Sequence, residues 1–157
     1  MLYLLDANVL IIADKQYYAI DRVPEFWDWL IHMGEAGSIK IAEEVYEEFD
    51  GGKDQLAVWA NRDDVRTALL LDEAVDITQV RLVIKNGYAA DLTDEEIEKL
   101  GRDPFLVAYA LVEPAKRTIV TTEVSKPKRI RANRHLPDVC DHFGVHCCNT
   151  FGLTTAL

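Results

Sequence analysis

The chain lacks a disulfide framework, because its three cysteines are odd in number and crowded near one end. They are Cys140, Cys147 and Cys148, whereas small domains stabilised by disulfides carry cysteines in pairs along their length. No C-x-x-C or zinc-finger spacing is present, so packed, reduced cysteines are favoured over a zinc site with the nearby His142 and His146. This cysteine usage is typical of a reducing compartment, and we expect the protein to be cytoplasmic.

Long apolar runs, internal repeats and low-complexity segments are missing as well. No run approaches the roughly 18 residues that a membrane-spanning helix needs. The first apolar stretch is interrupted by Asp6 and has neither the basic start nor the cleavage site of a signal peptide. We therefore expect no membrane or targeting segment. A length of 157 residues with 49% hydrophobic content suits one domain, residues 1–157, with a sizeable core.

The chain has few basic residues, and their distribution is uneven. Its net charge is −10, with 24 acidic and 10 basic side chains in residues 1–114 but 3 acidic and 7 basic in residues 115–157. The overall acidity argues against indiscriminate polyanion binding. Within the basic end, one stretch is a candidate phosphate-facing patch: Lys116, Lys126, Lys128, Arg129, Arg131 and Arg134. Four of these are the predicted RNA-binding residues: Lys126, Lys128, Arg129 and Arg131. A solvated loop is the alternative, and charge alone favours it.

Short apolar segments alternate with helix signals along the chain. Strands are predicted at 2–5, 39–42, 118–121 and 145–148, and helices at 24–35, 43–49, 53–61, 72–86, from 93, at 103–112 and at 138–143. Pro24 marks a helix start, and Thr93 with Glu96 forms a capping box. Strands separated by helices predict an α/β fold, a three-layer sandwich with a central, mostly parallel sheet and helices on both faces.

Acidic residues fall where such a sheet places its functional crevice, at the carboxyl ends of the strands. Asp6 follows the first strand, and Glu123 lies just beyond the third. Asp103 starts a helix that is expected to begin at the same edge. Each has an ordinary explanation: Asp103 before Pro104 can cap its helix, and Asp6 can hold a tight turn.

The predicted helix 43–49 carries four more acids, which helix geometry separates. At about 100° per residue, its apolar residues define an inward face. Only Glu48, and less surely Glu44, lies beside that face, whereas Glu43 and Glu47 point to solvent. Three or four carboxylates are thus expected to converge on one crevice.

Convergent carboxylates repel one another, and each raises the pKa of the others unless a cation lies among them. A set of oxygen ligands suits Mg²⁺ or Mn²⁺. In proteins, a pair of such ions activates water and stabilises the leaving oxygen in phosphodiester cleavage. The residues therefore favour a metal-dependent hydrolase.

Four segments in order resemble motifs of the PIN domain (PilT N-terminus) superfamily: L-L-D-A-N, I-A-E-E-V-Y-E-E-F, R-D-P-F-L-V-A-Y-A and I-V-T-T-E. Within it, the chain is similar to small prokaryotic VapC-like toxins. The resemblance implies a PIN-like fold and a Mg²⁺- or Mn²⁺-dependent endoribonuclease. It also implies that the protein is the toxin of a type II toxin–antitoxin pair, with an antitoxin as partner and a homodimer as assembly. It assigns catalytic and metal-binding roles to four acids, with two supporting polar residues: Asp6, Glu48, Asp103 and Glu123, supported by Asn8 and Thr121.

Two features depart from that pattern. Glu123 stands where many relatives have Asp, which lengthens the side chain by one methylene. Residues 51–100 are long for a minimal toxin-like member. Two other functions remain open. One is a PIN-like binding module with little or no catalysis; the other is a phosphoaspartyl hydrolase of haloacid-dehalogenase type with Asp6 as nucleophile. Asn8 disfavours the second, because that chemistry calls for another Asp there.

Overall fold

The computed structural model describes residues 1–157 and is built on a four-stranded parallel sheet in the order β2-β1-β3-β4. The strands are β1 (Leu2–Leu5), β2 (Ile39–Lys40), β3 (Arg117–Val120) and β4 (His146–Cys148). Leu4 on β1 lies opposite Lys40 and Ile119, and Ile119 lies opposite Cys147. At the carboxyl ends of the central strands, Leu4, Leu5, Ile119 and Val120 are apolar and fully buried, as expected for a parallel sheet covered on both faces.

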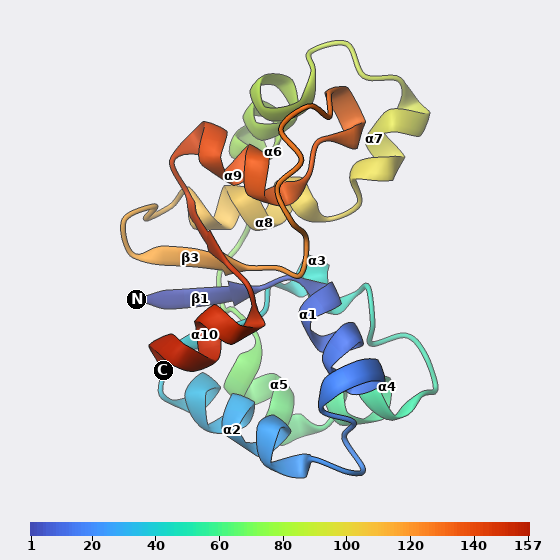
Figure 1. The fold of residues 1–157 in the computed structure, drawn as a ribbon, viewed down its shortest axis with the longest axis vertical. Helices are drawn as coiled ribbons and strands as arrows, with labels where there is room; N and C mark the ends of the chain where they lie inside the picture. The colour runs from blue at the N-terminus through green and yellow to red at the C-terminus, as the bar shows by residue number, and fades with distance from the viewer.

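Helices cover both faces of the sheet (Figure 1). One layer contains α6 (Ile77–Val83), α7 (Asp94–Leu100), α8 (Asp103–Ala110) and α9 (Leu136–Phe143). The opposite layer contains α1 (Ala7–Ile12), α2 (Pro24–Glu35), α4 (Gln55–Ala60), α5 (Asp63–Leu69) and α10 (Thr150–Ala156). The short α3 (Glu43–Tyr46) lies beside the tip of β1. The predicted α/β three-layer sandwich with a parallel sheet is confirmed.

Three further turns complete the helical elements. The π-helical η1 (Ala13–Tyr17) extends α1, the π-helical η2 (Ile84–Tyr88) extends α6, and the 3₁₀ turn η3 (Arg131–Asn133) precedes α9. No helix of the structure combines the length and apolar character needed to cross a membrane.

Local signals explain the best-defined helices. Pro24 opens α2, which ends at Glu35 as predicted and buries Phe26, Trp27 and Leu30. The capping box of α7 is confirmed, because the Thr93 hydroxyl accepts from the Glu96 amide at 3.2 Å. The Glu96 carboxylate accepts from the Thr93 amide in return, also at 3.2 Å.

Three helices and several boundaries differ from the predictions. Helices α1, α5 and α10 were not predicted, and α9 begins at Leu136 rather than at 138. In α1, the β-branched residues Val9, Ile11 and Ile12 have low helix propensity, and packing against the sheet overrides it. The predicted helix 72–86 is divided between α6 and η2, and 53–61 shortens to α4.

The hydrogen bonds of the sheet continue one residue beyond its strands. The Asp6 amide donates to the Val120 carbonyl at 2.9 Å, and the Thr121 amide donates to the Cys148 carbonyl at 2.9 Å. The residues that follow β1 and β3 are therefore held in register at the carboxyl edge of the sheet.

Candidate functional site

Asp6 and Thr121 form the centre of the site at this edge. Asp6 is only 4% exposed, and its Oδ2 accepts a hydrogen bond from Thr121 Oγ1 at 2.8 Å. Burial raises the pKa of Asp6, the hydrogen bond from Thr121 opposes that shift, and the charge of Glu123 adds to it. The adjacent strands β1 and β3 thus bring together two predicted residues that lie 115 positions apart.

Asp103 is the first residue of α8, and its carboxylate accepts no hydrogen bond. The position that caps this helix is occupied by Arg102, and no side chain caps it. The alternative explanation of Asp103 as a helix cap is therefore wrong. Burial raises the pKa of Asp103 to about 8, with further contributions from the charges of Asp6, Glu123 and Glu48.

Glu48 follows α3 and reaches the turn that precedes Asp103. A Cβ atom built on Gly101 would lie 3.5 Å from Glu48 Oε1, which places this carboxylate against that turn. Burial and then the charge of Asp6 raise the pKa of Glu48, while the amide and charge of Arg102 oppose the shift.

The other three acids near α3 are engaged elsewhere. The carboxylate of Glu44 accepts from the Tyr109 hydroxyl at 3.0 Å. Glu43 pairs with Arg66 at 3.3 Å, and Glu47 pairs with Arg102 at 3.0 Å. Of the four, Glu48 is the one whose charge raises the pKa of Asp103.

Glu123 is anchored at one of its two oxygens. Its Oε2 accepts from the amide of Leu136, the first residue of α9, at 2.7 Å. Its own amide donates to Thr121 Oγ1 at 3.2 Å, which links it to the hydroxyl that binds Asp6. Asn8 is exposed on α1, and its side chain makes no hydrogen bond.

The four acids therefore share one electrostatic environment and present only oxygen donors. Their chemistry fits Mg²⁺ or Mn²⁺. As they stand, the side chains do not form a ready group of three or more ligands for a metal ion. The difference is one of range, because charges interact over several ångströms, farther than the distance from a metal ion to its ligands.

A cationic pocket of about 280 Å³ adjoins Asp103 and Glu123. Its basic lining residues are Lys99, Arg129, Arg134 and His135. Of these, Arg129 was predicted to bind RNA, and Arg134 belongs to the basic stretch that was a candidate phosphate-facing patch. The others come from α7 and the end of the 123–136 loop, and no local sequence pattern joins them. The hydroxyl of Tyr88, which also lines the pocket, is buried and has no hydrogen-bond partner.

The remaining predicted cations differ in whether their side chains form ion pairs. Lys126 and Lys128 are exposed on the loop beside Arg129. Arg131 instead pairs with Asp91 at 2.8 Å and with Glu96 at 2.9 Å, and its backbone has a positive φ of 54°. These ion pairs hold the loop against α7, so Arg131 has a structural contact that Lys126 and Lys128 lack.

Comparison with known protein families covers nearly the whole chain. Residues 3–157 match the family described as "Domain of unknown function (DUF4411)". The chain belongs to the DUF4411 family. All four acids and the cationic pocket lie inside the part that matches DUF4411. No curated protein and no solved structure matches the chain.

Proposed function

We propose that this DUF4411 protein is a divalent-metal-dependent ribonuclease that hydrolyses phosphodiester bonds. The observation that carries the proposal is Asp103, a half-buried carboxylate that accepts no hydrogen bond and whose pKa is raised to about 8 by desolvation and three neighbouring acids. Buried charges in proteins are normally paired. Since no Lys or Arg pairs with Asp103, a bound divalent cation is the counter-charge that this carboxylate cluster suits.

In this proposal, Asp6, Glu48, Asp103 and Glu123 hold the metal. When bound, Mg²⁺ or Mn²⁺ lowers the pKa of water and neutralises charge on the phosphoryl oxygens. Thr121 fixes the orientation of Asp6 through its 2.8 Å hydrogen bond.

The cationic pocket supports a polyanionic substrate. Lys99, Arg129 and Arg134 lie beside Asp103 and Glu123, so they supply positive charge for a phosphate next to the carboxylates on a chain of net charge −10. The choice of RNA, the role as a toxin countered by an antitoxin protein, and a cytoplasmic location rest on the motif resemblance and the cysteine usage described above.

The test compares Asp6→Asn with Asp21→Asn, an exposed acid that makes no side-chain contact. Thermal melting is followed across a Mn²⁺ titration, and cleavage of a mixed RNA pool is measured in parallel. The parent protein and Asp21→Asn should gain stability with Mn²⁺, by mass action on the native state, and should cut RNA. Asp6→Asn should fold, lose the Mn²⁺ response and lose cleavage by at least about a hundredfold, more than the 10–100-fold typical of outer-shell partners.

Three outcomes would contradict the proposal. A parent protein that neither gains stability with Mn²⁺ nor cuts RNA is a binding module. An Asp6→Asn variant that unfolds assigns Asp6 a structural role. Turnover of a chromogenic phosphate monoester, with no cleavage of RNA, would favour the phosphoaspartyl hydrolase.

A further inference from the structure

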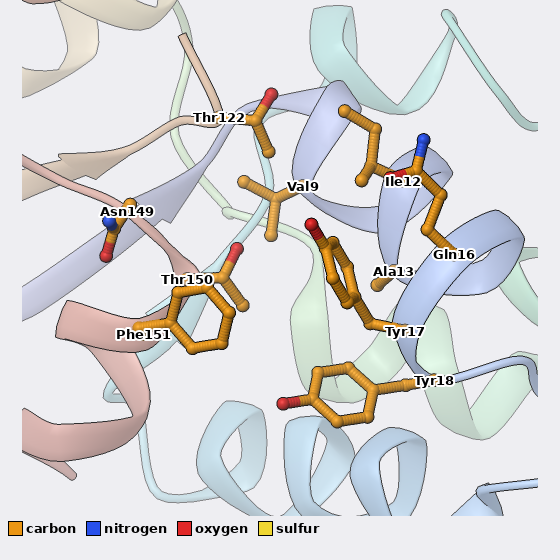
Figure 2. Close-up of a pocket in the computed structure, with 10 residues that line it drawn as sticks. All are labelled: Val9, Ile12, Ala13, Gln16, Tyr17, Tyr18, Thr122, Asn149, Thr150 and Phe151. Atoms are coloured by element: carbon orange, nitrogen blue, oxygen red, sulfur yellow. The ribbon is translucent and has the colours of Figure 1, made fainter. Parts of the chain in front are cut away.

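A second cavity, of about 250 Å³, opens at the carboxyl edge of the sheet between η1, α10 and the end of β3 (Figure 2). We call it the aromatic pocket and define it by Gln16, Tyr17, Tyr18, Thr122, Asn149 and Phe151. We propose that the aromatic pocket binds one nucleobase of a single-stranded RNA, next to the phosphodiester that is cleaved. This inference rests on the proposed ribonuclease function and adds a site for base recognition to it.

Two aromatic rings of the pocket are largely exposed to solvent. Tyr17 and Phe151 each expose 58% of their surface, although they come from opposite ends of the chain. Their ring centroids lie 6.1 Å apart at an interplanar angle of 75°. Aromatic surface that stays in contact with water forgoes the hydrophobic stabilisation that burial would give. Exposed aromatic faces are the platforms on which bases of single strands stack.

Tyr18 gives the pocket a rigid wall. Its ring is stacked on Phe26 of α2, with centroids 4.4 Å apart and an angle of 18°. The Trp27 indole donates to the Tyr18 carbonyl at 2.6 Å, which fixes the backbone at the end of η1. Tyr17, the preceding residue, is therefore presented from an anchored segment, and little entropy is lost when a ligand stacks on it.

Polar side chains lie at the rim of the aromatic pocket (Figure 2). The side chains of Gln16 and Thr122 form no hydrogen bond in the structure, and Figure 2 shows both at the edge of the pocket. Asn149 Oδ1 accepts from the Gly152 amide at 2.8 Å, so its NH₂ group is left to donate. Carboxamides pair with the donor and acceptor edges of bases. At about 250 Å³ the cavity is smaller than the roughly 300–1,000 Å³ of drug-sized sites, which suits one ring system.

The aromatic pocket adjoins the carboxylate cluster. Thr122, which lines it, lies between Thr121, which binds Asp6, and Glu123. Val9, another lining residue, lies in the first turn of α1, the helix that begins at the residue after Asp6. A base in the pocket therefore lies next to the carboxylate cluster, as a nucleotide attached to the cleaved phosphate requires.

The experiment measures binding rather than turnover. Fluorescence anisotropy compares a labelled ten-nucleotide RNA with an abasic ribose-phosphate oligomer of equal length, in Ca²⁺ in place of Mg²⁺, with a gel to show that the RNA stays intact. The variants are Phe151→Ala, Phe151→Trp and Tyr17→Ala. The control is Val112→Ala, which removes apolar surface that is similarly exposed, at 57%, but lies outside the pocket.

Phe151→Ala and Tyr17→Ala should each weaken binding of RNA roughly 5- to 20-fold and leave binding of the abasic oligomer unchanged, because stacking on one base is lost. Phe151→Trp and Val112→Ala should stay within about twofold of the parent. Equal affinity of the parent for RNA and the abasic oligomer overturns the inference, as does unchanged RNA binding in both alanine variants. Unchanged RNA binding in both alanine variants would favour a protein partner as the ligand of the exposed rings. These results leave the proposed function intact, whereas a parent protein that binds neither oligomer and cuts no RNA contradicts the function itself.

Discussion

The charged groups at the two ends of strand β3 differ in whether they have a partner of opposite charge. At the amino end, Arg117 is 5% exposed, and its guanidinium donates to Glu73 at 2.6 and 2.8 Å and to the Tyr109 carbonyl at 3.0 Å, while its Nε has no partner. At the carboxyl end, Asp6 is buried and Asp103 is half-buried, and both lie among like charges with no basic partner. The first arrangement has its own counter-charge within the protein and stabilises the fold. The second costs stability unless a ligand supplies positive charge, which is typical of a functional site.

The largest effect expected at the carboxyl end comes from Glu48. Glu48→Gln should lower RNA cleavage by about a hundredfold, which equals about 2.7 kcal/mol, because a metal ligand is lost. Glu44→Gln is the matched control, since its side chain can still accept from the Tyr109 hydroxyl. The measurement is the rate of RNA cleavage by each of the two variants at saturating Mn²⁺. If Glu44→Gln is the inactive variant, the four acids near α3 have been assigned to the wrong sides of the helix.

At the amino end, Glu73→Gln should act on stability and not on metal binding. Breaking the pair leaves Arg117 buried without a counter-charge, which costs about 3 kcal/mol, the low end for buried pairs because Glu73 is itself 34% exposed. The melting temperature should fall by roughly 5–10 °C. The Mn²⁺-induced rise should persist. Glu113→Gln, in the exposed pair with Lys116, should change neither quantity measurably. A lost Mn²⁺ response in Glu73→Gln would show that the two ends are not independent.

The pKa of Asp103 predicts an unusual dependence on pH. An unfolded Asp ionises near its ordinary value of about 3.9, whereas folded Asp103 ionises at about 8. Between these values the folded state holds the extra proton, so metal-free stability should fall as pH rises. Asp103→Asn should therefore melt several degrees above the parent at pH 8 in EDTA, and the gap should close towards pH 4. A variant less stable than the parent at pH 8 would mean that Asp103 is already neutralised in the fold.

The smallest effect is expected from the exposed loop. Replacing Lys126, Lys128 and Arg129 by Ala should reduce the slope of log affinity against log salt by about 0.7 for each lost phosphate contact on single-stranded RNA. Alanines at Lys53 and Lys85, exposed cations outside the pocket, should leave the slope unchanged. An unaltered slope in the triple variant would show that the loop is solvated and makes no phosphate contact.

The sequence predicted the sheet and the placement of the acids better than the helices around them. Asp6 and Asp103 were located because strand ends and helix starts leave local signals, and parallel strands bring those ends to one edge. Helix α5 was missed because its seven residues are fewer than the window over which a helical period is recognised, although Val65, Ala68 and Leu69 do recur at helical spacing. Nothing local connects Tyr17 with Phe151 or Lys99 with Arg134, since only tertiary packing brings such distant residues into one pocket.

The strand order also determines when the site can form. β1 pairs with β3 at the centre of the sheet, and the Asp6–Thr121 hydrogen bond closes a loop of 115 residues. Contacts this distant in sequence form late and slow down folding, because the entropy of loop closure is lost before they are made. During synthesis, domains fold from their N-terminal side only as the partner segments emerge. A ribosome-bound chain from which β3 has not yet emerged therefore lacks Thr121 and Glu123 at its carboxylate cluster, so any activity would begin only after most of the protein has been made.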